Sequence, residues 1–386
     1  MAQQINEILK KIIVLGAGLV GKPIALDLAS TSDFKVTVAD LSQTKLDDII
    51  DGRINKIQAD LQNKDELNSI IAQFDFIVVA VPGFMGFTCL KNCINAGKDI
   101  VDIAFYPEDV FDLSKLAEQK GVRVISDMGV APGMSNLLVG YAASKLDKVL
   151  NADIYVGGLP KIRTKPWEYK AVFSPSDVIE EYTRPARIVR NGEIVTVPPL
   201  TEIEHLEFDA VGTLEAFNSD GLRSLLFTIK ADNMSEKTLR YPGYADKIKL
   251  LSDNGFFSPD KIEVGEDLVS PLELTSKLLF HKWKLEENEV DITVMRIIVE
   301  GLKSGKKVRY SYELYDEFCK ETGVHSMART TGYTASTAIR LLARDKYIQK
   351  GISVGEMMGN DEAVVNFMLD GLKERGINYE SKIEYL

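Results

Sequence analysis

Residues 11–21 read KIIVLGAGLVG, a short apolar run followed by three glycines at G-x-G-x-x-G spacing. The apolar run is typical of a buried strand, and the glycines predict a tight turn into a helix. Gly16 would permit the turn, and Gly18 would let the backbone approach a pyrophosphate. Gly21 would let the helix pack closely, with its N-terminal N–H groups facing the anion. The predicted cofactor contacts in this turn are Gly16, Gly18, Leu19, Val20 and Gly21.

A second predicted strand, KVTVAD, ends at Asp40, which lies 22 residues after Gly18. An acidic residue at about 20 residues' spacing hydrogen-bonds the ribose hydroxyls of NAD. It would also repel the 2'-phosphate of NADP. We therefore expect NAD rather than NADP, although Lys45 or Arg53 could still reach a phosphate. In the alternative, Asp40 only ends the strand and caps the helix that starts near Gln43.

Strands and helices continue to alternate up to about residue 130, and FIVVAV at 76–81 is apolar on both faces, as in a central parallel strand. Six such strands predict an α/β fold with a Rossmann-type, doubly wound parallel sheet. Ligands of such sheets bind beyond the carboxyl ends of the strands. This rule adds further candidate cofactor contacts: Asp60, Val81, Pro82, Gly83 and Asp102. Asp60 could instead cap the next helix. Asp102 is ambiguous in the same way, as either a cofactor contact or a cap.

After residue 130 strands dominate, and Asn191-Gly192 predicts a β-hairpin over 187–197. A strand is also expected at 169–173, and a long hairpin should turn near 303–306. This pattern predicts an α/β second domain with a large mixed sheet for substrate binding and dimerisation. We expect three segments: a Rossmann domain at 1–130, the second domain at 131–355, and a C-terminal segment at 356–386 that returns to the Rossmann domain.

The composition is that of an ordinary globular protein, with 386 residues, 45% hydrophobic and 27% charged. A net charge of −11 argues against nucleic acid or an acidic membrane as the main partner. No apolar run approaches the roughly 20 residues of a membrane span, and polar residues before the first strand argue against a signal peptide. Three cysteines are too few for a disulfide framework. We expect a cytoplasmic protein that requires no metal.

Several long motifs in chain order resemble the saccharopine dehydrogenase (reductase) family, with greatest similarity to its L-lysine 6-dehydrogenase branch. The motifs are GAGLVG, VPGFMGF, SDMGVAPGMSN, YVGGLP, FSPSDVIEEYTRPARIVRNG, EAFNSDGLRSLL and TLRYPG. The resemblance implies a homodimer that deaminates the side-chain amine of L-lysine oxidatively with NAD. The product aldehyde would cyclise with its own α-amine. Two alternatives stay open: a C–N reductase such as saccharopine reductase or a carboxypolyamine dehydrogenase, and a non-catalytic NAD-binding sensor.

Amine oxidation requires the loss of a proton, because the lysine side chain has a pKa of about 10.4 in water. Asp127 ends the sixth strand and is a candidate proton acceptor, although it could instead cap the following helix. Tyr106, with Glu108, follows the fifth strand and is a second candidate, although both could be surface loop. Asp220 could steer the α-ammonium group. The other candidates for substrate binding are Arg184 and Arg223 for the α-carboxylate, either of which could be a structural ion pair, and Asn218.

Overall fold

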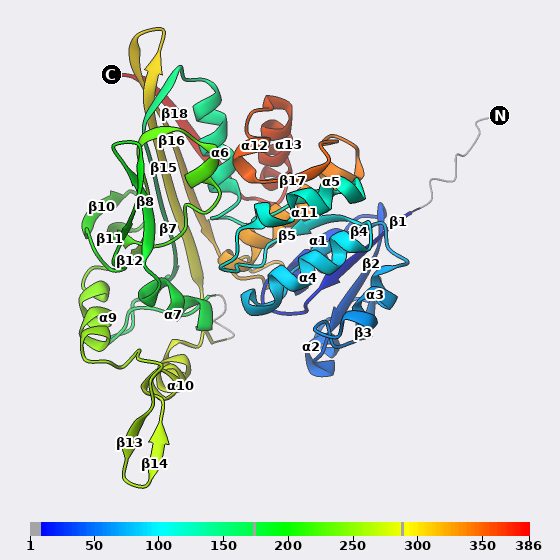
Figure 1. Cartoon of the computed structure of the whole chain (residues 1–386), viewed down its shortest axis with the longest axis horizontal. Coiled ribbons are helices and arrows are strands. Elements are labelled where there is room, and N and C mark those ends of the chain that lie inside the picture. The colour runs from blue at the N-terminus through cyan, green and yellow to red at the C-terminus, as the bar shows by residue number, and fades with distance from the viewer. Residues whose placement is uncertain (1–8, 173–174, 287–288) are drawn as a thin grey trace, which may run out of the picture. The chain divides into compact units, whose positions relative to one another are not determined.

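The computed structural model describes residues 9–172, 175–286 and 289–386 (Figure 1). The chain divides into two compact units. Unit 1 extends to Met134 and is completed by Thr331–Met358 and Glu362–Arg375. Unit 2 comprises Ser135–Thr330, Gly359–Asp361 and Gly376–Leu386.

The sheet of unit 1 contains seven parallel strands in the order β17-β6-β5-β4-β1-β2-β3. Its strands are β1 (Lys10–Leu15), β2 (Phe34–Asp40), β3 (Ile54–Gln58), β4 (Phe76–Val79), β5 (Asp99–Asp102), β6 (Arg123–Ile125) and β17 (Gly351–Ser353). β2 and β4 lie on opposite sides of β1. The strand order therefore reverses at β1, whose carboxyl end leads into the glycine motif. The predicted doubly wound parallel sheet is confirmed, and β17 is a seventh strand that was not predicted.

Helices connect these strands and pack on the sheet. They are α1 (Gly21–Ala29), α2 (Gln43–Asp47), α3 (Lys64–Ile71), α4 (Gly83–Asn95), η1 (Val110–Leu113), α5 (Ser114–Lys120), α11 (Ser326–Ala343), α12 (Gly355–Met358) and α13 (Glu362–Lys373). The central strand β1 is fully buried from Ile12 to Leu15, and all of β4 is buried too. Helices on both faces of a parallel sheet produce this burial, which explains the continuous apolar runs in the sequence.

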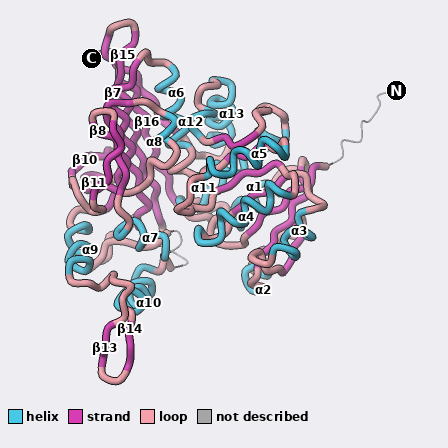
Figure 2. The backbone as a smooth tube through the Cα atoms, viewed as in Figure 1, coloured by secondary structure: helices cyan, strands magenta, loops and turns pink. Residues whose placement is uncertain are grey.

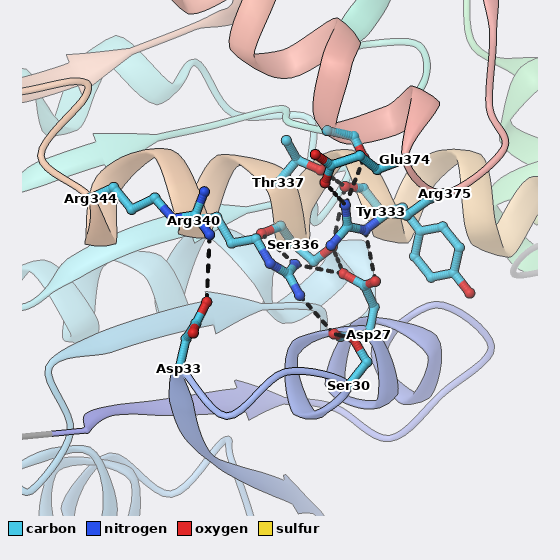
Figure 3. A network of polar contacts seen from close by, with 11 residues as sticks. Asp27, Ser30, Asp33, Tyr333, Ser336, Thr337, Arg340, Arg344, Glu374 and Arg375 are labelled. Carbon is cyan, nitrogen blue, oxygen red and sulfur yellow. Dashed lines mark hydrogen bonds and ion pairs between the residues drawn. The ribbon is translucent and has the colours of Figure 1, made fainter.

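Asp27, on α1, lies between two arginines in Figure 3. Arg340 on α11 donates hydrogen bonds to Asp27 Oδ2 at 2.6 Å and to its main-chain oxygen at 2.7 Å. Arg375, just after α13, donates from Nε to Asp27 Oδ1 at 2.7 Å. The side chains of Asp27 and Arg340 are only 8% and 6% exposed. We call these three residues the Asp27 clamp; it joins the helix of the glycine motif to two helices from the end of the chain.

Unit 2 is built on a nine-stranded mixed sheet, seen as the broad set of magenta strands in Figure 2. Its main path is β10-β11-β12-β7-β15-β16-β18, and the hairpin β8-β9 joins it through β12. The strands are β7 (Lys148–Pro160), β8 (Ala186–Arg190), β9 (Glu193–Val197), β10 (Glu204–Phe208), β11 (Gly212–Asn218), β12 (Ala231–Arg240), β15 (Asp291–Lys303), β16 (Lys306–Glu317) and β18 (Tyr379–Tyr385). β12 and β7 are parallel, and the other pairs are antiparallel. The predicted large mixed sheet is confirmed.

The remaining elements of unit 2 are α6 (Met134–Ser144), α7 (Pro175–Thr183), α8 (Leu225–Thr228), α9 (Tyr244–Asp253), α10 (Pro271–Trp283) and a small hairpin of β13 (Ile262–Val264) and β14 (Asp267–Val269). Side chains of α7, α9 and α10 form one aromatic core with Phe217 of β11. In Figure 2 these three helices gather beside one end of the sheet. Both predicted hairpins are confirmed, with turns at Asn191-Gly192 and Ser304-Gly305.

Two predictions for this half of the chain are wrong. The described part of the expected strand at 169–173 is not a strand, apart from a single bridge between Ala171 and Lys284, and Phe173 lies outside the described residues. Tyr169 instead packs against Trp283 in the aromatic core. The last strand, β18, was expected against the Rossmann domain, but it pairs with β16 in the sheet of unit 2.

Candidate functional site

The glycine turn of unit 1 has the geometry that its spacing predicted. Gly16 has a φ of +107°, and a Cβ there would overlap the carbonyl oxygen of Ala80. A Cβ on Gly21 would overlap the carbonyl oxygen of Gly16, so α1 packs closely on the turn. Gly18 differs, because a Cβ there would meet no atom within 4 Å. The open side of the turn is therefore at Gly18, where a pyrophosphate would approach the backbone.

Asp40 lies beside this turn at the carboxyl end of β2. Its Oδ2 accepts a hydrogen bond from the Ala17 N–H at 2.7 Å, and its Oδ1 accepts one from the Ser42 N–H at 2.8 Å. The cap of α2 is Ser42, whose side chain accepts a hydrogen bond from Lys45 N, so Asp40 does not cap that helix. Arg53 pairs with Asp51 through two side-chain hydrogen bonds. A carboxylate thus lies at the position where a Rossmann domain holds the adenosine ribose.

The other candidate cofactor contacts also lie at strand ends. Val81 is buried, and Pro82 is the N-cap of α4. A Cβ on Gly83 would overlap the carbonyl oxygen of Phe105. Asp60 accepts a hydrogen bond from Gln62 N, and the cap of α3 is Asn63, so Asp60 does not cap that helix. Leu19 and Val20 complete the turn, with Leu19 exposed at its surface.

A buried polar cluster lies at the carboxyl ends of β5 and β6. The hydroxyl of Tyr106 donates to Asp102 Oδ2 and contacts Ser126 Oγ, each at 3.0 Å. Ser126 Oγ also donates to Asp102 Oδ2 at 3.2 Å. Burial, reinforced by the charge of nearby Asp127, raises the pKa of Asp102 to about 7. Asp127 is 4% exposed and has a φ of +54°. Two buried carboxyls, Asp102 and Asp127, therefore lie at or just after the ends of neighbouring strands and are close enough for the charge of one to affect the other.

Asp102→Asn should change how stability depends on pH. The folded state keeps the Asp102 proton between pH 3.8 and about 7, whereas the unfolded chain releases it. The free energy of unfolding should therefore fall by a few kcal/mol as pH rises through this interval. Asparagine cannot ionise, so thermal midpoints at pH 4.5 and pH 8 should differ less in the variant. An identical loss in both proteins would contradict the pKa shift assigned to Asp102.

The candidate substrate residues of unit 2 are placed as follows. Asp220 accepts two side-chain hydrogen bonds from Arg187, at 2.9 and 3.0 Å, and one from its N–H at 3.1 Å. Arg184 forms an ion pair with Glu180 one helical turn away. Asn218 is fully buried, and its Nδ2 donates to Thr201 Oγ1 at 3.2 Å.

Arg223 is buried, and its φ is +52°. Asn218 is thus the last residue of β11, Asp220 and Arg223 lie in the segment between β11 and α8, and Arg184 directly follows α7.

The sequence did not single out Arg187 or Ser126. Arg187 is in the same motif as Arg184 but belongs to strand β8. Successive side chains of a strand lie on opposite faces of the sheet, and this alternation is the signal that could have separated Arg187 from its neighbours. Ser126 precedes Asp127 in SDMGVAPG, and only the position of Tyr106 shows its role. Glu108, the proposed companion of Tyr106, is exposed, whereas Tyr106 is fully buried. Tyr106 is therefore part of the cluster and not surface loop.

A cavity of about 300 Å³ opens on unit 2, and it contains none of the predicted site residues. Four charged side chains along its wall form ion pairs, Arg190 with Glu202 and Lys237 with Glu204, and Asp153 accepts a hydrogen bond from Ser235. Among the residues that the structure describes, no three His, Cys, Asp or Glu side chains lie where they could hold a metal ion. Within the same residues, none of the helices combines the length and apolar character needed to cross a membrane.

Comparison with known proteins identifies the family. One family model, the saccharopine dehydrogenase NADP binding domain, matches residues 12–125. A second, the saccharopine dehydrogenase C-terminal domain, matches residues 129–377. The chain belongs to the saccharopine dehydrogenase family.

Curated members of the saccharopine dehydrogenase family are distant in sequence. The NADP(+), L-glutamate-forming saccharopine dehydrogenase of Pyricularia oryzae is 25% identical over 316 residues, which cover 78% of this chain and 69% of that protein. The alpha-aminoadipic semialdehyde synthase of Arabidopsis thaliana is 25% identical over 307 residues, covering 68% of this chain but only 29% of the plant protein. This chain therefore spans less than a third of the plant protein.

Apo saccharopine dehydrogenase (L-Glu forming) from Saccharomyces cerevisiae has the same fold, with a TM-score of 0.80 at 19% identity over 97% of this chain and all of that one. As a member of the saccharopine dehydrogenase family, this chain is an NAD(P)-dependent oxidoreductase of the amino-acid dehydrogenase class. The expectation that NADP is the less favoured cofactor gains no support, because both the family model and the fungal relative are named for NADP.

Proposed function

We propose that this protein oxidises the side-chain amine of L-lysine with NAD, forming the 6-semialdehyde and releasing ammonia. The choice of lysine is supported by YVGGLP, EEYTRPAR and NSDGLRSLL in unit 2, which resemble the lysine 6-dehydrogenase branch. The chemistry is supported by the two buried carboxyls, Asp102 and Asp127, at the ends of β5 and β6. This carboxyl pair carries the proposal, because amine oxidation needs a proton acceptor near the nicotinamide.

In this mechanism Asp127 accepts a proton from the substrate ammonium, since only a neutral amine can support loss of hydride from the adjacent carbon. Asp102, held by Tyr106 and Ser126, keeps the surroundings of Asp127 polar but shielded from water. NAD, when bound, supplies the hydride acceptor. Loss of hydride leaves an iminium, water adds to its carbon, and ammonia departs. The resulting aldehyde condenses with the substrate's own α-amine to form a six-membered ring.

The test is an absorbance assay for the reduced nicotinamide with NAD or NADP. The substrates are L-lysine, saccharopine and a carboxylated polyamine, each offered alone. We expect reduced cofactor and free ammonia with L-lysine. Oxidation of saccharopine without reaction of L-lysine would replace the proposal by the second candidate, a saccharopine-type C–N reductase, which the names of the curated relatives favour.

The preference for NAD is part of the proposal, and Asp40 supports it. Asp40→Arg removes a charge that repels the 2'-phosphate and adds a guanidinium that binds it. The ratio of kcat/KM for NADP to that for NAD should rise about 100-fold, since juxtaposed like charges cost several kcal/mol.

Asp40→Asn is the matched control, because it removes the charge and keeps an oxygen that can accept from Ala17 N. It should change the ratio less than Asp40→Arg does. A ratio that is the same in all three proteins would remove Asp40 from the ribose site.

We also propose a homodimer formed through unit 2, as the family resemblance implies. The broad sheet of unit 2 has exposed apolar residues on its last strand, Ile383 and Tyr385. Light scattering should give twice the chain mass of 42.9 kDa.

A further inference from the structure

Among the described residues, unit 2 contains a buried carboxyl with one oxygen that has no hydrogen-bond partner. Glu236 lies in the middle of β12 and is 6% exposed. Within the described residues its Oε2 accepts no hydrogen bond. The carboxyl lies against Gly221, where a Cβ would coincide with Oε2. A buried polar atom without a partner costs stability, so its presence calls for an explanation.

The acidic neighbours of Glu236 are already neutralised. Asp220 is bound on both oxygens by Arg187. Glu181 accepts a hydrogen bond of 2.6 Å from the buried Arg240. Glu236 has no such arginine partner in the part of the chain that the structure describes. Burial, together with the charges of Glu181 and Asp220, raises the pKa of Glu236 well above its usual value. Burial at this position therefore favours the neutral form of Glu236 over the charged form.

A second unpartnered group, Ser224, lies three residues after Gly221, at the start of α8. The hydroxyl of Ser224 is buried, and its Oγ also has no hydrogen-bond partner within the described residues. The turn over 218–224 contains Gly221 and the predicted substrate residues Asn218, Asp220 and Arg223. Both unsatisfied oxygens can accept hydrogen bonds, as a ligand that brings N–H donors requires.

We propose that Glu236 binds the α-ammonium group of the amino-acid substrate, a role that rests on the function proposed above. The reacting side-chain amine must become neutral, so the α-ammonium is the substrate cation that keeps its charge. The sequence assigned this cation to Asp220, but Arg187 occupies that carboxylate. When the ammonium enters, its N–H donates to Oε2, and Glu236 releases its own proton to solvent.

The test uses the whole protein with saturating NADH, which cannot accept hydride, so that ligands bind without turnover. L-Lysine is compared with 6-aminohexanoate, which lacks only the α-amine, by titration calorimetry. The variant is Glu236→Gln, and the matched control is Glu263→Gln, which removes an exposed carboxylate from the same unit.

We expect the wild-type protein and the control to bind L-lysine about 10- to 100-fold more tightly than 6-aminohexanoate, as for hydrogen bonds to a charged group. Glu236→Gln should lose most of this difference and release one proton fewer on binding L-lysine. Its thermal midpoint should be equal or higher, because a buried unpaired acid has been removed.

The outcomes separate the role of Glu236 from the function. If the wild-type protein turns over L-lysine while Glu236→Gln keeps both its KM and the preference over 6-aminohexanoate, the role is overturned and the function stands. A lower midpoint with unchanged binding also overturns it, since Glu236 would then be structural. No turnover of L-lysine by the wild-type protein overturns both.

Discussion

Gly16→Ala is expected to destabilise unit 1 by about 2–5 kcal/mol, because two costs add at this position. A Cβ at a φ of +107° is strained by roughly 1–2 kcal/mol. The same Cβ overlaps the carbonyl oxygen of Ala80, and overpacking typically costs about 1–3 kcal/mol more. Urea unfolding monitored by circular dichroism measures the sum.

Gly18→Ala is the matched substitution in the same turn. Its Cβ meets no atom within 4 Å, so the free energy of unfolding should stay within about 1 kcal/mol of the wild-type value. The added methyl group nevertheless occupies the open side of the turn, where the pyrophosphate approaches. We therefore expect a folded protein with at least about 10-fold weaker binding of the nicotinamide cofactor, measured by NADH fluorescence. Full NADH affinity in Gly18→Ala would show that the dinucleotide does not cross this turn.

Asp27→Ala is the second substitution with a large expected effect. It leaves the guanidinium groups of Arg340 and Arg375 in the Asp27 clamp without their carboxylate, and both are mostly buried. Breaking a buried ion pair by removing one partner typically costs about 3–5 kcal/mol. Burial lowers the pKa of Arg340, whereas the charge of Asp27 raises it. The buried guanidinium therefore depends on Asp27 to keep its charge. We expect the urea midpoint to fall accordingly.

Asp33→Ala provides the control for Asp27→Ala. Asp33 pairs with Arg344 at 3.5 Å, but both side chains are about half exposed. Such surface pairs contribute about 0–1 kcal/mol. Equal urea midpoints for the two variants would mean that the clamp contributes no more than a surface ion pair.

The fold of unit 1 was predictable because strands such as β1 and β4 contain short apolar runs bounded by turn residues. The sequence did not predict β17, because Gly351–Ser353 is only three residues long and shows no periodicity. The sequence did not predict β12 either, but for a different reason. Its buried residues include Glu236, Thr238 and Arg240, which are polar, so the apolar pattern of a buried strand is missing.

The candidate site also contains residues that the sequence could predict and residues that it could not. The glycine turn and Asp40 belong to a local motif with a fixed spacing, so the sequence placed them. Asp220 and Arg187 are 33 residues apart, and only the pairing of distant strands shows that they bind each other. The raised pKa of Glu236 comes from its burial and from the charges of Glu181 and Asp220, and no pattern along the chain reveals such surroundings.

The Asp27 clamp has a consequence for biosynthesis. Asp27 emerges early from the ribosome, but its two arginines follow 313 and 348 residues later. A nascent chain can form the first strands and the glycine turn, yet the nucleotide-binding unit acquires its last strand and its clamp only after residues 135–330 of unit 2 have been synthesised. The cofactor-binding half is therefore completed late, although its signature motif is translated first.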